Sequence, residues 1–364
     1  MSAFPGAQHV IQQAIASRVT PCAVVEVGRH SGVTWRVASG RLTYDADARA
    51  TGTETVFDLA SLTKVLATTS LAMRLVDEGR LDLQARVADL LPSWRGVGRE
   101  AVKVADLLAH SSGLPAHRPL CRSCASREEF ERAICSEPLE FTPGTASVYS
   151  DLGFILLGFL LEDLAAAPLD VQFERVRDAI GASAELHAGT VSAPVPLEVR
   201  YRPPAQWQER IAPTRSESAQ PGIVDDGNAA ALDGVAAHAG LFGTVSAVGR
   251  MASAVLGARL DANDRQAIAR HDTVVRFTSR AGVAGSSRAL GWDTMLPTSS
   301  CGTRMSSQAF GHTGFTGTSL WIDPVADIYV VLLTNRGYPA PRNAEGITAL
   351  RRAVHDAVMD EVVE

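Results

Sequence analysis

Ser61 and Lys64 are the pair of residues whose types and spacing most directly suggest chemistry. They lie in the segment Phe57-Asp58-Leu59-Ala60-Ser61-Leu62-Thr63-Lys64, and a helical pattern follows at once. Residues three apart share one helix face, so the lysine amine can reach the serine hydroxyl. A serine hydroxyl is a weak nucleophile at neutral pH, and a neighbouring lysine is one way to activate it. The helix N-terminus adds N–H groups and a positive dipole end that stabilise a negatively charged oxygen.

Two further motifs lie at expected element boundaries. Tyr149-Ser150-Asp151 precedes an apolar run from residue 152 to 161, and His312-Thr313-Gly314 precedes a strand near Leu320. A single tyrosine is more often a packed aromatic, and a single histidine is more often structural or solvated. The order and spacing of all three motifs favour one common site.

Composition restricts the class of protein. The 364 residues are 46% hydrophobic and 20% charged, which predicts a folded chain of one large or two medium domains. The formal net charge of −6 and the lack of a basic cluster argue against nucleic acid or an anionic membrane as partner. No apolar run has the length of a membrane span. The first ten residues lack a signal-peptide pattern, so we expect a cytoplasmic protein.

The five cysteines allow one alternative. Cys121, Cys124 and Cys135 could hold zinc or an iron–sulfur cluster if His117 or Cys301 joined them. A second paired Cys/His motif is missing, and an odd number of cysteines in a large chain favours free thiols. We therefore predict no metal site and no required cofactor.

The elements that must position these motifs come from both ends of the chain. A helix over residues 10–18, strands over 23–28 and 33–37, strands over 320–322 and 328–333, and a helix over 344–362 are predicted from their hydrophobic patterns. Between them, residues 62–78, 104–110 and 154–164 are typical of helices, and residues 183–228 of a long surface excursion. Strands at both ends predict one α/β layer with a mostly helical region inserted into it.

The three motifs together resemble those of the serine β-lactamase-like hydrolases, which include class C β-lactamases, D,D-carboxypeptidases and related esterases. That family carries S-x-x-K, then Y-x-N, then K-T-G or H-T-G near a C-terminal strand. The segment 106–115 is similar to its L-L-x-H-x-S-G-L segment. The resemblance covers nearly the whole chain. It implies an α/β fold of the β-lactamase/D,D-peptidase type, with an antiparallel sheet from residues 1–55 and 285–364 and a mainly helical region from 56–284.

The resemblance also implies roles. Ser61 would be the acylated nucleophile, and Lys64 and Tyr149 would share the proton transfers. The N–H groups of Ser61 and Phe315 would form the oxyanion hole. Thr313 would bond a substrate carboxylate or carbonyl, and Asp151, His312 and Gly314 would complete the substrate-binding set.

Two departures from the family pattern affect the chemistry. Asp151 replaces the usual asparagine, and an ionised carboxylate there could hold Lys64 protonated. His312 replaces the lysine of most β-lactamases. We expect this histidine to be mostly neutral at pH 7 and to gain charge as the pH falls, which makes the cleft less positive and favours neutral esters.

Residues outside the three motifs receive weaker expectations. His110 is predicted to end a helix, where its charge would suit the dipole. The segment around Asp225, Asp226 and 237–242 is predicted to be a turn packed near the cleft rather than a direct substrate contact.

The sequence predicts a serine hydrolase that acts through an acyl-enzyme on a small ester, amide or β-lactam. The H-T-G motif and the segment 238–242 favour β-lactamase or D,D-carboxypeptidase-like chemistry, whereas the lack of a signal pattern favours a carboxylesterase or a cytoplasmic amidase. A non-catalytic relative that binds such ligands is the third alternative, and the intact Ser61, Lys64 and Tyr149 argue against it. The oligomeric state is left open.

Overall fold

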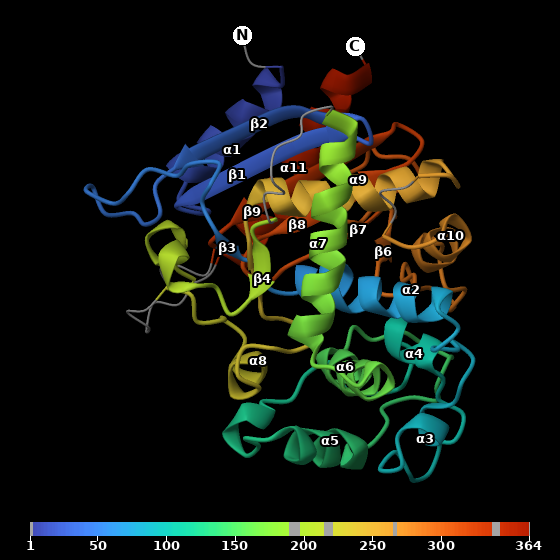
Figure 1. The fold of residues 1–364 in the computed structure, drawn as a ribbon. Helices are drawn as coiled ribbons and strands as arrows, with labels where there is room; N and C mark the ends of the chain where they lie inside the picture. The colour runs from blue at the N-terminus through green and yellow to red at the C-terminus, as the bar shows by residue number, and fades with distance from the viewer. Residues whose placement is uncertain (1–2, 189–196, 215–220, 265–267, 337–342, 364) are drawn as a thin grey trace.

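The computed structural model describes residues 3–188, 197–214, 221–264, 268–336 and 343–363. The chain forms a layered α/β part made from both termini and a mainly helical part made from the middle of the sequence (Figure 1). Part of the excursion predicted over residues 183–228 lies outside the described residues.

The main sheet has six strands in the order β2-β1-β9-β8-β7-β6, and every pairing is antiparallel. Its strands are β1 (Cys22–Arg29), β2 (Gly32–Gly40), β6 (Asp293–Thr294), β7 (Phe310–Thr313), β8 (Ser319–Asp323) and β9 (Ile328–Thr334). The central strand β9 is buried along its whole length, so it is an unbroken apolar run instead of an alternating one. The N-terminal and C-terminal strands therefore lie side by side, as the sequence predicts.

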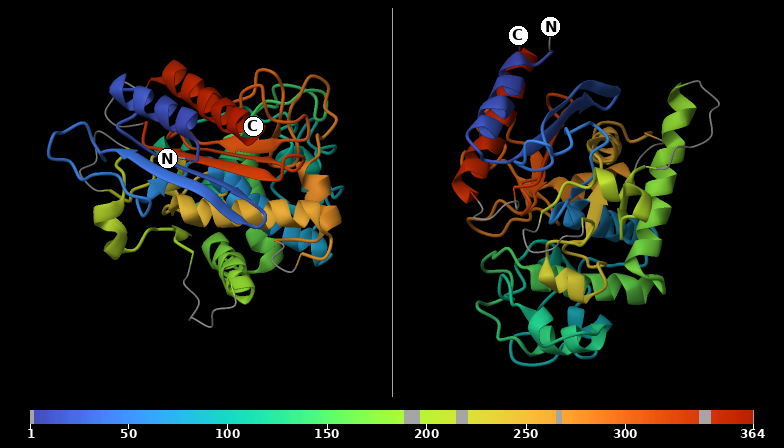
Figure 2. Two further views of the ribbon diagram at one scale, coloured as in Figure 1. Left: turned by 90° about the horizontal axis from the view of Figure 1, so that it is seen from above. Right: turned by 90° about the vertical axis from the view of Figure 1, so that its left-hand side faces the viewer.

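Helices cover both faces of this sheet. The outer face packs against α1 (Pro5–Ala16) and α11 (Ala344–Val363), which contact each other, and the inner face packs against α9 (Val245–Leu260) (Figure 2). The first helix begins at Pro5 rather than near residue 10, because proline is well suited to the first turn of a helix.

The middle of the chain supplies the remaining helices. They are α2 (Ser70–Asp77), α3 (Val87–Leu90), α4 (Val104–Leu108), α5 (Arg127–Ser136), α6 (Asp151–Ala165), α7 (Leu169–Ala188), α8 (Gly227–Ala231) and α10 (His271–Thr278), with short turns of helix at η2 (Leu120–Arg122) and η3 (Ala205–Arg210). A π-helical segment, η1 (Lys64–Thr69), runs directly into α2, and the two together form the nucleophile helix. Residues Leu152 to Leu161 of α6 are all buried. This helix is the core of the helical part and carries the second motif at its start.

A second, three-stranded sheet was not predicted. It has the order β3-β5-β4, with β3 at Phe57–Asp58, β4 at Val199–Tyr201 and β5 at Leu241–Gly243. Strands of two or three residues are too short to show an alternating pattern. The sheet matters for the site because β3 leads directly into the turn that carries Ser61.

Among the described residues, no single helix is long and apolar enough to cross a membrane. The pair formed by α6 and the first part of α7 passes on length and composition together, but it is bent by 77°.

Candidate active site

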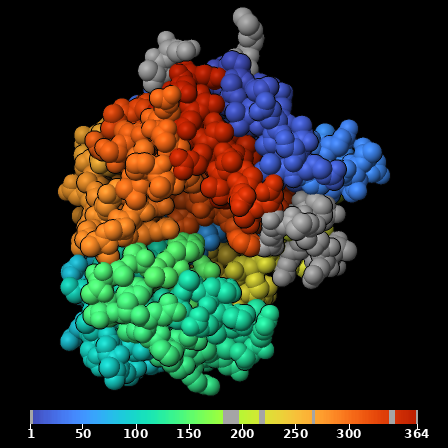
Figure 3. Space-filling view, turned by 180° about the vertical axis from the view of Figure 1, so that it is seen from behind, coloured from blue at the N-terminus to red at the C-terminus, as the bar shows by residue number. Residues whose placement is uncertain are grey.

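A cavity of about 1250 Å³ lies where the end of β7 in the main sheet meets the helical part. The face in Figure 3 is hollowed between the C-terminal residues in orange and red and the helical residues in green. The cavity is lined by all but one of the site residues predicted from the sequence: Ser61, Tyr149, Asp151, His312, Thr313, Gly314 and Phe315. The exception is Lys64, which is fully buried behind Ser61.

The turn before Ser61 is held in a conformation that L-residues rarely adopt. Ala60 has φ of +48°, and its N–H donates to Asp58 Oδ1 at 2.8 Å. The third-motif segment secures the same turn, because Thr316 Oγ1 donates to the Asp58 carbonyl oxygen at 2.8 Å and Thr318 Oγ1 donates to that of Leu59 at 3.2 Å. Backbone strain of this kind persists only where the surrounding structure over-determines it. These bonds place Ser61 at the start of the helix at the edge of the cavity.

Lys64 is fully buried and uses all three of its ammonium donors. Nζ donates to Ser61 Oγ at 3.1 Å, to Asp151 Oδ1 at 2.8 Å and to the carbonyl oxygen of His238 at 3.0 Å. Burial opposes the charged form, but the Asp151 carboxylate outweighs it and raises the pKa of Lys64. The resting lysine is therefore an ammonium that points at the nucleophile.

Asp151 is the first residue of α6, whose start is fixed by Ser150. The Ser150 Oγ accepts the N–H of Gly153 at 3.2 Å, which caps the helix. Burial opposes ionisation of Asp151, but the Lys64 ammonium holds the pKa of this carboxyl well below its usual range. Asp151, in place of the family's asparagine, is thus an ionised carboxylate beside Lys64 and helps to keep Lys64 protonated, as expected.

Tyr149 lies at the centre of a cluster of rings and cations. Its ring centroid is 4.7 Å from that of His110 and 5.6 Å from that of His312. Lys64 Nζ lies 4.8 Å from the same centroid, and the Arg288 guanidinium carbon lies 5.0 Å from it. Two cations therefore face the same aromatic ring.

His312 is neutral near pH 7, as expected, but its surroundings oppose the gain of charge that was expected as the pH falls. This residue is only 3% exposed, and burial, together with the nearby Arg288 and Lys64, holds the pKa of its imidazole well below 6.5. Its Nδ1 lies 2.8 Å from the carbonyl oxygen of Thr313, so Nδ1 carries the proton. The other nitrogen, Nε2, is a buried lone pair with no partner among the described residues.

The expected charge on His110 is also wrong. Its Nδ1 accepts the N–H of Ser150 at 3.0 Å, its side chain is buried, and burial holds its pKa well below 6.5. The ring stacks on Phe154 with centroids 4.9 Å apart. A neutral His110 therefore packs against the Tyr149 ring and does not place a charge at the end of a helix.

The third-motif turn approaches the nucleophile closely. A Cβ on Gly314 would lie 2.7 Å from the Leu59 carbonyl oxygen, so a side chain cannot be accommodated there without displacement. Arg351 of α11 is 8% exposed and donates to the carbonyl oxygens of Gly314, Thr318 and Gly317 at 2.5, 2.9 and 3.2 Å. A buried guanidinium thus fixes the turn that presents Phe315, whose role in an oxyanion hole remains a prediction.

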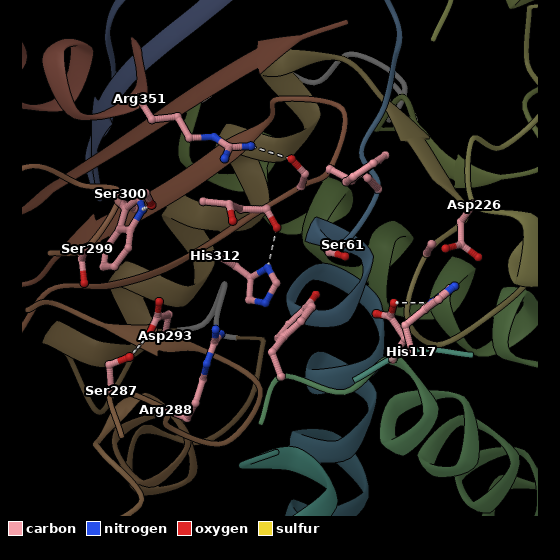
Figure 4. Close-up of a pocket in the computed structure, with 18 of the residues that line it drawn as sticks. Ser61, His117, Asp226, Ser287, Arg288, Asp293, Ser299, Ser300, His312 and Arg351 are labelled. Carbon is pink, nitrogen blue, oxygen red and sulfur yellow. Dashed lines mark hydrogen bonds and ion pairs between the residues drawn. The ribbon is translucent and has the colours of Figure 1, made fainter. Parts of the chain in front are cut away.

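Three residues of the site were not predicted. Arg288 points into the cavity toward His312 from the loop before β6 (Figure 4), and its guanidinium makes no hydrogen bond or ion pair within the described part of the chain. His117 lines the opposite side of the cavity, and the His238 carbonyl oxygen accepts the third hydrogen bond of Lys64. Asp225 and Asp226 line the cavity as well, so the turn that carries them borders the cleft as expected.

The cysteines offer no metal site in the ranges that the structure describes. No group of three or more His, Cys, Asp or Glu side chains there could hold an ion. Cys121 is exposed, Cys124 and Cys135 are buried, and all of the cysteines are free thiols.

Comparison with known proteins places this site in a family. The Beta-lactamase family profile matches residues 7–355. The chain is 32% identical over 323 residues to an N-acetylmuramyl-L-alanine amidase of Bacillus subtilis, covering 78% of this chain and 68% of the relative. It is 29% identical over 328 residues to a putative D-alanyl-D-alanine carboxypeptidase of Salmonella agona, covering 80% and 72%.

Solved structures share the fold. A β-lactamase from Sulfitobacter sp. EE-36 superposes with a TM-score of 0.75 at 22% identity, covering 98% of this chain and 97% of that one. EstCE1, a hydrolase with promiscuous acyltransferase activity, gives a TM-score of 0.73 at 23% identity and covers 98% of both chains. With an antiparallel sheet flanked by helices from both termini, an inserted helical region and a match along nearly its whole length, the chain belongs to the Beta-lactamase family.

Proposed function

We propose that the protein is a serine hydrolase that forms an acyl-enzyme on Ser61 and cleaves a small amide, ester or β-lactam whose structure includes a carboxylate. Ser61 Oγ attacks the carbonyl carbon, and its proton passes to the unit formed by Tyr149 and Lys64. The same unit returns a proton to the leaving nitrogen or oxygen. Water then attacks the acyl-enzyme by the reverse sequence and releases the acid.

The Lys64 geometry supports Tyr149 as the group that first receives the proton. All three Lys64 donors are already engaged, one of them on Ser61 Oγ, so the ammonium has no lone pair to accept a proton. Tyr149 lies beside this ammonium and beside Arg288, and its phenol oxygen is the group that we propose takes the Ser61 proton.

Arg288 is the observation that carries the choice of substrate. A guanidinium without a carboxylate partner, next to the candidate acid–base residues, is matched to a planar carboxylate. Its fixed charge does not depend on His312. The names of the two curated relatives, an amidase and a putative carboxypeptidase, support an amide over an ester.

The test compares two substrates that differ only in charge. An acylated D-alanyl-D-alanine peptide and its C-terminal methyl ester are assayed with wild type, Arg288→Gln and a control variant, Arg304→Gln. Arg304 pairs with Asp360 on the surface, outside the cavity lining. We expect Arg288→Gln to lower kcat/KM for the free acid by roughly 10- to 100-fold, the loss typical of one charge-assisted hydrogen bond, and to leave the methyl ester nearly unchanged.

The alternative of a small-acyl carboxylesterase predicts a different result. Efficient hydrolysis of neutral nitrophenyl esters, with no turnover of carboxylate substrates and no effect of Arg288→Gln, would replace the proposal with that alternative. Binding of these ligands without any turnover would favour the non-catalytic relative.

A further inference from the structure

Asp151 connects the buried lysine to the surface. Its Oδ1 lies 2.8 Å from Lys64 Nζ, and its Oδ2 lies 3.5 Å from His117 Nδ1. The Lys64 side chain is 0% exposed, that of Asp151 is 18% exposed and that of His117 is 51% exposed. One carboxylate therefore lies between an ammonium that contacts the nucleophile and an imidazole that is half exposed to solvent.

We propose that His117 is a positioning residue that sets, through Asp151, the net charge beside the unit formed by Tyr149 and Lys64, and so sets the pH at which this unit can take the Ser61 proton. This inference rests on the proposed function, because it concerns the acylation step at Ser61.

The physical reason is the shared carboxylate. A protonated His117 places a positive charge beside Asp151 Oδ2, which offsets part of the negative charge that Asp151 places beside the unit of Tyr149 and Lys64. A neutral His117 leaves Lys64 as the main cation on Asp151, and the unit as a whole then holds its protons more tightly. The proton that the unit loses before acylation goes to solvent, so no other reactant is needed.

Asp151 is the acid that His117 contacts, and the other charged groups lie around this pair. The charged groups that act on His117 are Asp151 of α6, Asp226 at the start of α8, and Arg118, which follows His117 in the chain. Asp226 Oδ1 is 2.8 Å from His238 Nε2. The contact with Asp151 raises the pKa of His117, so this imidazole keeps its charge to a higher pH than it would without the carboxylate.

The other charged groups near Asp151 differ from His117 in their partners and in their exposure to solvent. Arg118 pairs with Glu137 at 3.1 Å and with Glu140 at 3.7 Å, so its charge is partly offset. The groups that raise the Lys64 pKa are Asp151 and Tyr149, and His238, which also acts on Asp151, is 1% exposed. His117 is the most exposed of the groups that act on Asp151, at 51%.

The experiment measures the rate of Ser61 adduct formation with an uncharged fluorophosphonate, by intact mass, from about pH 5.5 to pH 9. An uncharged probe is used so that Arg288 does not contribute. The variants are His117→Gln, which is neutral at every pH, and His117→Lys, which is a fixed cation. The matched control is His30→Gln, because His30 forms the same kind of pair with Asp327, at 2.8 Å and 53% exposure, outside the cavity lining.

The expected result is a shift of the pH midpoint, not a uniform loss. Without the His117 charge, the unit of Tyr149 and Lys64 keeps its proton to higher pH, so His117→Gln should raise the midpoint by about 0.5 to 1 pH unit and slow labelling several-fold below it. His117→Lys should lower the midpoint, and His30→Gln should match wild type. In an Asp151→Asn background, His117→Gln should cause no further shift.

Two results would overturn the inference. One is an unchanged midpoint in both His117 variants, whether labelling slows uniformly or not at all. The other is an equal shift in His30→Gln. Absence of any Ser61 adduct in the wild type at every pH would contradict the proposed function instead, so the two failures are distinguishable.

Discussion

At the scale of single residues, the site is defined by how many partners Lys64 has. Its three N–H groups donate to Ser61, to Asp151 and to the His238 carbonyl oxygen. These bonds join the nucleophile, the second motif and the segment before β5 into one hydrogen-bonded unit. Tyr149 belongs to the same unit because the Lys64 ammonium lies 4.8 Å from its ring centroid.

Lys64 and Tyr149 should therefore fail together when mutated. We expect Lys64→Met and Tyr149→Phe each to lower kcat by several orders of magnitude, and the double variant to be about as slow as the worse single one, since residues that act as a unit are not additive. The measurement is a double-mutant cycle on kcat for one peptide substrate. Independent, multiplying losses would show that the two residues do not share the proton transfer.

His312 gives a second prediction at this scale. Because burial keeps its imidazole neutral, the preference for a carboxylate substrate over its methyl ester should stay flat from about pH 6 to pH 8. The ratio of the two kcat/KM values is the measurement, and it cancels any pH dependence that both substrates share. A ratio that climbs several-fold as the pH falls would mean that His312 gains charge after all.

At the scale of elements, the turn from β3 into the nucleophile helix depends on Asp58. This side chain is buried, and it accepts N–H bonds from Ala60 at 2.8 Å and from Asp225 at 2.7 Å. Burial raises the pKa of Asp58 to about 7, while these bonds oppose the rise. The native state then binds a proton that the unfolded chain releases near pH 4.

The sign of the stability change follows from this difference in proton binding. Between about pH 4 and pH 7 the native state holds more protons than the unfolded state, so the free energy of unfolding falls as the pH rises, by at most about 4 kcal/mol from this group. Urea unfolding at the two ends of the window should show a smaller pH effect in Asp58→Asn than in wild type. The same pH dependence in both proteins would remove Asp58 as the cause.

Much of the element order could be predicted from the sequence, because β1, β9 and α11 carry long apolar patterns. Strands β3, β4 and β5 could not, since two or three residues show no period. The three motifs predicted Ser61, Lys64 and Tyr149 as neighbours. Arg288 lies in a loop without a pattern, and the His238 contribution is a backbone carbonyl that no side-chain signature reveals.

The charge states of the histidines show a different limit. His110 and His312 are each part of a motif that can be recognised in the sequence. Their neutrality, however, comes from burial among residues far apart in the chain. A sequence gives a residue's ordinary pKa, whereas the shift depends on the assembled neighbours.

At the scale of the whole molecule, both termini build the sheet that carries the third motif, and α11 reaches back through Arg351 to hold its turn. The helical part supplies Tyr149, Asp151 and His117 from the other side of the cavity. The site thus exists only when the two parts are packed together.

The whole chain should also prove free of bound metal. Cys121 is exposed while Cys124 and Cys135 are buried, and the part of the chain that is described holds no ligand set for an ion. We expect elemental analysis of the purified protein to find no stoichiometric zinc or iron. About one metal per chain, lost in Cys121→Ser, would show a structural metal site instead.

The central claim is that Ser61 is the acylated nucleophile, and intact mass after incubation with a penicillin and with a fluorophosphonate tests it most directly. The account predicts one adduct per chain with at least one of the two reagents, located by peptide mapping at Ser61. It also predicts that Ser61→Ala loses the adduct and the turnover together. An adduct on another serine, or full activity in Ser61→Ala, would contradict it.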